Sequence, residues 1–140
     1  MRAAVLLAAA ALACAGCIEL GDETLYGPEF ETTGTATFAD VQRLFDQSCA
    51  LAGCHGGPAP SADLSLEEGQ SFEELLGPDG TGAPPVDRVC GGKLRVVPGS
   101  PDDSCLWNLV ASGAMPPGNP LPQPQKDIIR RWIEDGAKAE

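Results

Sequence analysis

Two cysteines and the only histidine of this chain lie within one short segment, CALAGCH at positions 49–55. Two cysteines followed at once by a histidine are typical of covalent haem attachment. Each thiol bonds to one vinyl group of the porphyrin, and His55 places an imidazole at the iron. A chain with this motif has to fold around a flat, bulky cofactor. The usual spacer between the cysteines is two residues and here it is four, so the extra residues must bulge outward, which Gly53 makes less costly.

The rest of the chain is poor in the side chains that fill a core. It has four Phe, two Trp and one Tyr, against 13 Pro and 17 Gly. A domain of about a hundred residues with this composition usually needs a staple, such as disulfides, a metal or a large apolar cofactor. The sequence therefore predicts short helices, long loops and a covalent or cofactor-based staple.

Apolar residues recur at helical spacing in four short segments, and no segment alternates as a strand does. The pattern predicts helices over residues 37–48, from 71 until Gly77, from 100 until Gly113, and over 124–135. Ser71 is expected to begin a capping box, and Ser100 to cap the third helix ahead of a proline. The predicted fold class is all-α, with four short helices and long loops rich in Gly and Pro.

The N-terminus predicts export and a lipid anchor. A short positive start and an apolar run over residues 3–13 are typical of a signal peptide, here residues 1–16. Ala15-Gly16-Cys17 resembles the bacterial lipobox, which implies that Cys17 is lipidated and holds the chain to a membrane facing the periplasm or cell surface. Ile18 after this cysteine favours the outer membrane. Ordinary secretion without a lipid is the alternative.

The mature chain divides into a tether and one domain. Residues 17–36 are acidic and rich in Gly and Thr, which predicts a flexible tether, and residues 37–140 form the domain. The whole chain has a net charge of −11, and loss of Arg2 with the signal peptide makes it −12. Such an acidic chain does not bind nucleic acid through phosphate neutralisation.

Met115 is the only methionine left after export, and it is the natural second ligand to an iron at His55. Methionine opposite histidine raises the reduction potential of a c-type haem. Pro116 and Pro117 would hold the Met115 loop rigidly. With both axial positions filled, no open site remains for a substrate, so we expect an electron carrier and not an enzyme.

Four stretches of sequence carry a family resemblance. These are FDQSC followed by CHGG within 45–57, RVVPGSP at 95–101, MPPG at 115–118, and IRRWIEDGA at 129–137. They resemble the small cytochrome c domains attached to many exported planctomycete and myxobacterial proteins, over about residues 38–137. The resemblance implies a cytochrome c-like fold around one covalent haem c, whose thioethers and axial ligands are Cys49, Cys54, His55 and Met115.

The same resemblance implies that the first and last helices cross, through Val41, Phe45, Trp132 and Ile133. It also implies a membrane-tethered monohaem carrier that exchanges single electrons with an unidentified redox protein.

Exported cysteines normally form disulfides, and this leaves an alternative open. Cys49, Cys54, Cys90 and Cys105 allow three pairings. A Cys49–Cys54 disulfide would give a haem-free, stapled lipoprotein that acts as a binding module. We expect Cys90 to pair with Cys105, which would stabilise the fold by about 3 kcal/mol. A zinc site is a poor candidate, because its ligands would be thiols in an oxidising compartment with a single histidine.

The sequence allows two interpretations for each of two other residues. Arg95 either pairs a haem propionate or is a solvated loop charge. Trp107 packs either at the haem edge or in the core.

Overall fold

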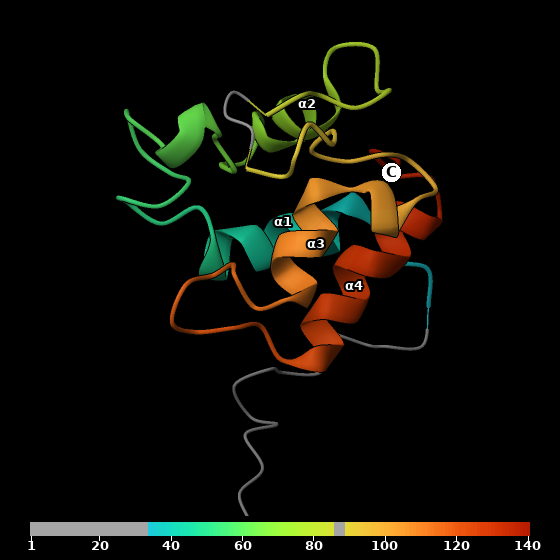
Figure 1. The fold of residues 1–140 in the computed structure, drawn as a ribbon. Coiled ribbons are helices and arrows are strands. Elements are labelled where there is room, and N and C mark those ends of the chain that lie inside the picture. Colours follow the sequence, from blue (N-terminus) through green and yellow to red (C-terminus); the bar gives the residue numbers. More distant parts are fainter. Residues whose placement is uncertain (1–33, 86–88) are drawn as a thin grey trace, which may run out of the picture.

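The computed structural model describes residues 34–85 and 89–140, and this part of the chain contains helices and no β-strand (Figure 1). The α-helices are α1 (Phe38–Ser48), α2 (Ser71–Leu76), α3 (Cys105–Ala111) and α4 (Gln123–Glu134), with two short 3-10 helices, η1 (Ser61–Asp63) and η2 (Pro101–Asp103). The all-α prediction is confirmed. None of the described helices is both long and apolar enough to cross a membrane. The predicted signal peptide, Cys17 and the tether up to residue 33 lie outside the described residues.

The first helix begins where its sequence provides a cap. Thr37 accepts a hydrogen bond from the backbone N–H of Asp40, and the Asp40 carboxylate accepts one from the backbone N–H of Thr37. This reciprocal capping box satisfies two N–H groups that the first turn would otherwise leave without partners. One face of α1 is fully buried through Val41, Leu44 and Phe45, as the helical spacing predicts.

The first and last helices pack against each other at the centre of the domain (Figure 1). Val41 and Phe45 of α1 belong to the same buried cluster as Trp132 and Ile133 of α4, so the first and last helices pack together as expected. The buried indole of Trp132 donates to the carbonyl oxygen of Lys138 at 2.8 Å, which removes the cost of burying its N–H group. The contact between α1 and α4 fixes the position of the C-terminal end of α1.

The ends of α2 and α3 differ from the sequence prediction. Ser71 is not a cap: it lies inside α2, fully buried, and its hydroxyl donates to the side-chain oxygen of Gln42. Ser100 does not cap α3 either, because η2 stands between them. The hydroxyl of Ser104 accepts from Val97 N–H at 2.8 Å and donates to the Ser100 carbonyl at 2.8 Å. These bonds hold Ser104 extended, so α3 begins only at Cys105.

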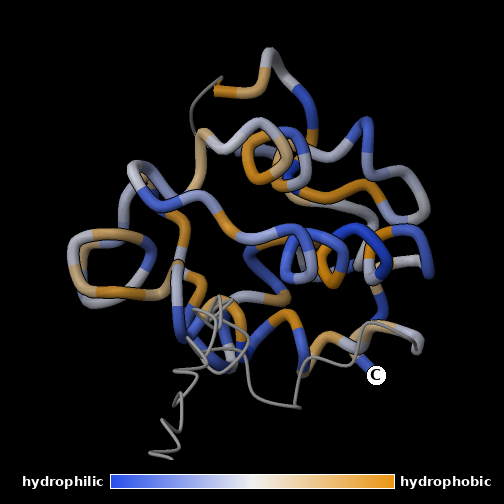
Figure 2. Tube along the Cα trace, turned by 90° about the horizontal axis from the view of Figure 1, so that it is seen from below, coloured by the Kyte–Doolittle hydropathy of each residue, from blue (hydrophilic) through white to orange (hydrophobic). Residues whose placement is uncertain are grey.

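The last helix lies within one residue of its predicted bounds. Gly136 follows it with a φ of 95°, and its N–H donates to the carbonyl of Ile133 at 3.0 Å. Glycine adopts this left-handed conformation without the penalty of a side chain, and so ends the helix. Along the described residues, short hydrophobic stretches alternate with hydrophilic ones (Figure 2), which is the pattern of helices that each bury one face.

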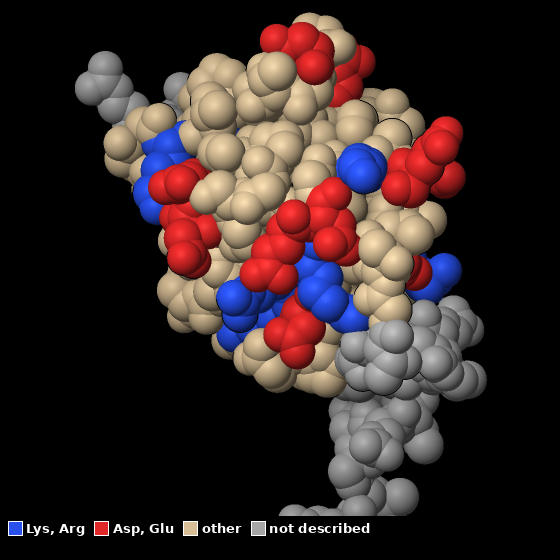
Figure 3. Space-filling view, turned by 90° about the vertical axis from the view of Figure 1, so that its right-hand side faces the viewer, with Lys and Arg blue, Asp and Glu red and all other residues tan. Residues whose placement is uncertain are grey.

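The charged surface carries both signs. On the face shown in Figure 3, Lys and Arg atoms lie beside Asp and Glu atoms. Two ion pairs lie at the surface: Arg130–Glu134 at 2.9 Å, which is exposed, and Arg43–Asp40 at 3.4 Å, which is partly exposed. Exposed pairs of this kind contribute about 0–1 kcal/mol each, so the fold depends on its buried cluster.

Candidate cofactor-binding site

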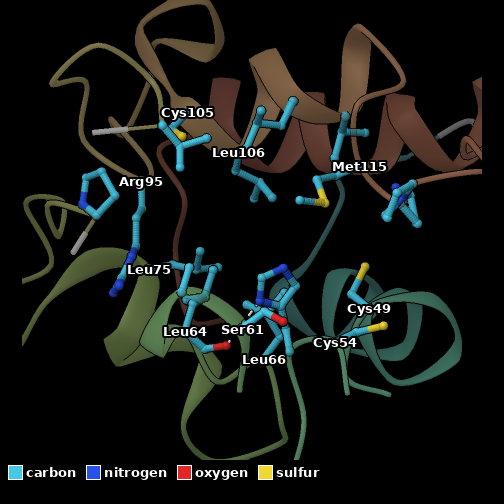
Figure 4. A pocket seen from close by; sticks show the side chains of 18 of the residues that line it. Cys49, Cys54, Ser61, Leu64, Leu66, Leu75, Arg95, Cys105, Leu106 and Met115 are labelled. Atoms are coloured by element: carbon cyan, nitrogen blue, oxygen red, sulfur yellow. Dashed lines mark hydrogen bonds between the residues drawn. The ribbon is translucent and has the colours of Figure 1, made fainter. Parts of the chain in front are cut away.

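One cavity of about 230 Å³ brings together the four residues that the sequence singles out (Figure 4). Cys49 follows the end of α1, Cys54 and His55 follow in the next loop, and Met115 comes from the loop after α3. His55 and Met115 are 60 positions apart in the sequence. Most of the remaining wall is apolar and includes Leu64, Leu66, Leu75, Leu106, Leu109 and Val110.

The four-residue spacer between the cysteines folds into a closed loop. The carbonyl of Leu51 accepts from the N–H groups of Cys54 at 2.9 Å and Gly56 at 3.2 Å, and the N–H of His55 donates to the carbonyl of Cys49 at 3.0 Å. A side chain at Gly56 would meet the backbone oxygen of Ala50 at 2.2 Å, so only glycine fits there. The loop therefore returns the chain so that both cysteines line the cavity.

The two cysteines of the motif are free thiols, one half-buried and the other exposed. Burial, together with the neighbouring Cys54, raises the pKa of Cys49 to about 12. Cys49 is therefore a neutral thiol at physiological pH. A neutral thiol suits an apolar wall, because a buried thiolate would need a compensating charge.

The imidazole of His55 is held by one ring nitrogen. Its Nδ1 lies 3.2 Å from the carbonyl oxygen of Leu64. A carbonyl oxygen only accepts, so Nδ1 is the donor, and in the neutral imidazole Nε2 is the nitrogen that can bind a metal. Metal-binding histidines are oriented in this way by a backbone carbonyl. A second bond, from the Leu66 N–H to the His55 carbonyl at 2.8 Å, fixes the backbone at the same place.

Met115 reaches the cavity because the chain turns sharply after α3. Gly113 has a φ of 77°, and the N–H of Met115 donates to the carbonyl of Leu109 at 3.1 Å. Figure 4 shows the Met115 sulfur directed into the space, across from the wall that contains Leu64 and Leu66. His55 is bonded to that opposite wall. The imidazole and the thioether thus belong to facing sides of one cavity.

The other pair of cysteines forms the expected disulfide, Cys90–Cys105, across a sequence separation of 15. Cys105 is itself part of the cavity wall. The disulfide therefore ties Cys90 to the start of α3, on the side of the cavity that α3 provides.

The two residues left open by the sequence are now placed. Arg95 is 7% exposed and lines the cavity, so its interpretation as a solvated loop charge is wrong. Trp107 is not among the residues that line the cavity. It packs against the core cluster, with the guanidinium of Arg130 5.8 Å from its ring centroid.

The cavity offers several side chains that can bind a cofactor. In residues 34–85 and 89–140, no group of three or more His, Cys, Asp and Glu side chains is placed to hold a metal ion. The cavity instead offers one imidazole and one thioether on facing walls, and two free thiols at the end of α1. These are the donors of a c-type haem site.

No protein-family model matches the chain, and the comparisons with curated proteins and with solved structures also give no match. The sequence did not indicate that Leu64 orients His55, because any residue can supply a backbone carbonyl.

Proposed function

We propose that this protein is a membrane-tethered monohaem c-type cytochrome that transfers single electrons. The observation that carries the proposal is the convergence of Cys49, Cys54, His55 and Met115 on one apolar cavity. These are the only histidine of the chain, the only methionine after the first residue, and the two cysteines of the motif. A haem site requires these four residues to meet, although His55 and Met115 are 60 positions apart. A disulfide-stapled binding module has no such requirement.

Each residue would hold the cofactor in a definite way. Cys49 and Cys54 would bind it as thioethers, and His55 and Met115 would be the axial ligands. Bound haem supplies the one-electron chemistry of its iron. Nε2 of His55 would be the ligating atom, because Nδ1 is engaged by the Leu64 carbonyl. The apolar wall excludes water, which limits how much the surroundings must rearrange when one electron is gained or lost.

The anchor and the partner belong to the same proposal. A lipid on Cys17 would hold the domain at the membrane surface, and residues 18–33 would give it reach toward a redox protein. The predicted tether extends to residue 36, but Ala36 belongs to the buried core cluster and the Gly34 carbonyl accepts from Arg131 at 2.8 Å, so the domain begins before residue 37. With two protein ligands on the iron, electron transfer is favoured over chemistry on a bound substrate.

Two sets of variants test the proposal on the full chain, expressed with the c-type maturation machinery. Cys49→Ser and Cys54→Ser should each keep haem through one remaining thioether, whereas the double variant should hold only haem that acid–acetone extracts, and the unmodified chain should keep its haem. Met115→Ala should lose the far-red absorption band of methionine ligated to ferric haem. Leu109→Ala is the matched control, because it shortens another apolar side chain of the same wall and should retain the band. Haem-free protein from every variant and from the parent would reject the proposal and favour the stapled binding module.

A further inference from the structure

Arg95 is the one permanently charged residue among those that line the cavity. Its backbone is fixed on both sides, since its N–H donates to the carbonyl of Ala83 at 2.7 Å and its carbonyl accepts from Leu106 N–H at 2.9 Å. Its side chain is only 9% exposed, whereas that of Arg130 on α4 is 54% exposed. A buried guanidinium is costly unless anionic or hydrogen-bonding groups surround it.

Glu74 satisfies only part of this guanidinium. Nη1 of Arg95 donates to the Glu74 carbonyl at 2.7 Å and to its carboxylate at 3.0 Å. A guanidinium has five N–H donors. Among the described residues no buried side-chain nitrogen or oxygen atom lacks a partner, so the donors of Arg95 at Nε and Nη2 are accessible to solvent or to the cavity. Arg95 is therefore oriented by Glu74 and still has donors to offer.

The cavity has two chemically different ends. In Figure 4, Cys49 and Cys54 lie at one end and Arg95 at the other, with Met115 between them on one wall. Protoporphyrin has the same polarity, because its two vinyl groups lie on one side of the ring and its two propionate carboxylates on the opposite side. A porphyrin joined to the thiols through its vinyl groups would direct its carboxylates toward the Arg95 end.

We propose that Arg95 is a carboxylate-binding residue of the cavity and that it pairs with a propionate of the haem. This inference rests on the proposed function. Glu74 is the positioning residue: it holds the guanidinium against α2 and leaves donors for the ligand. A carboxylate at this place forms charge-assisted hydrogen bonds, which are stronger than neutral ones. The pairing keeps the propionate ionised and places a fixed positive charge beside the cofactor.

The first test compares porphyrins that differ only at the carboxylates. The full chain, produced without the maturation machinery, is titrated with ferric protoporphyrin IX and with its dimethyl ester. The parent should bind the diacid about tenfold to a hundredfold more tightly than the ester, as expected for a hydrogen bond to a charged group. Arg95→Gln should lose this preference. Arg130→Gln, which removes the same charge from an exposed pair with Glu134, should keep it.

The second test uses the haem-loaded chain and its reduction potential. Between pH 5 and 9 the potential of the parent and of Arg130→Gln should be nearly constant. Arg95→Gln should lower the potential, because a cation that disfavours the ferric state is lost, and should add a pH-dependent step from the released propionate. Arg95→Lys keeps a positive charge and should restore part of the lost reduction potential. If Arg95→Gln does not fold, Arg95→Lys is compared with the parent in its place.

The outcomes separate this inference from the proposed function. If the parent binds neither porphyrin and acquires no haem, both are wrong. If it acquires haem but does not discriminate between diacid and ester, or if Arg95→Gln behaves like Arg130→Gln, the role of Arg95 alone is wrong.

Discussion

Gln42 of α1 is buried against α2 and the segment that orients His55. Its replacement should destabilise the fold. Its Nε2 donates to the Leu66 carbonyl at 3.0 Å and to Asp46 at 2.7 Å, and its Oε1 accepts from the hydroxyl of Ser71. In Gln42→Leu, the Leu66 carbonyl and the Ser71 hydroxyl would remain buried without this partner. Each such group costs about 1–3 kcal/mol, so the free energy of unfolding should fall by about 2–6 kcal/mol.

A double-mutant cycle separates this network from simple repacking. Ser71→Ala removes one of the two groups that Gln42→Leu leaves unsatisfied. The double variant should therefore be more stable than the sum of the single effects predicts, by about 1–3 kcal/mol. Urea unfolding of the full chain measures these values, with every variant in the same cofactor state.

The control for Gln42 comes from α4. Gln123 also donates to an aspartate four residues on, Asp127, at 2.7 Å, but on an exposed surface. Gln123→Leu should change the free energy of unfolding by no more than about 0.5 kcal/mol. If Gln42→Leu is no more destabilising than Gln123→Leu, or if the effects of Gln42→Leu and Ser71→Ala simply add, the argument from the buried network is refuted.

Two further predictions concern the loop from Cys49 to Gly56. Gly56→Ala should lower the free energy of unfolding by at least about 2 kcal/mol, because its Cβ would meet the Ala50 oxygen. Gly34 has open space around it, so Gly34→Ala should be near neutral in the same urea experiment. Equal effects of the two substitutions would contradict the tight packing of this loop. In the haem-free chain at pH 8, iodoacetamide should modify the exposed Cys54 at least about a hundredfold faster than Cys49, since the raised pKa of about 12 keeps Cys49 protonated. The Cys49 rate should rise steeply with pH up to about 12, and equal rates at pH 8 would show that Cys49 is not shielded.

The first and last helices were predictable because their signals are local. Val41 and Phe45 on α1, and Trp132 and Ile133 on α4, recur at the spacing of one helical face, and that face is buried whatever it packs against. The shared cavity of His55 and Met115 followed from the chemistry of the motif and not from periodicity.

The remaining features depend on partners that are distant in the sequence. A serine followed closely by two acids predicts a helix cap, but the Ser71 hydroxyl is bonded to Gln42, 29 positions earlier. Arg95 stands in a segment that reads as loop, and its burial depends on Glu74, 21 positions earlier. Propensity and capping patterns describe neighbours along the chain, so they contain no information on such pairs.

The central claim is that this cavity holds one covalently attached haem. The most direct measurement is the intact mass and visible spectrum of the full chain expressed with the c-type maturation machinery. The account predicts the mass of one added haem and sharp absorption bands on reduction. A colourless protein whose mass shows only disulfides, including one between Cys49 and Cys54, would contradict it.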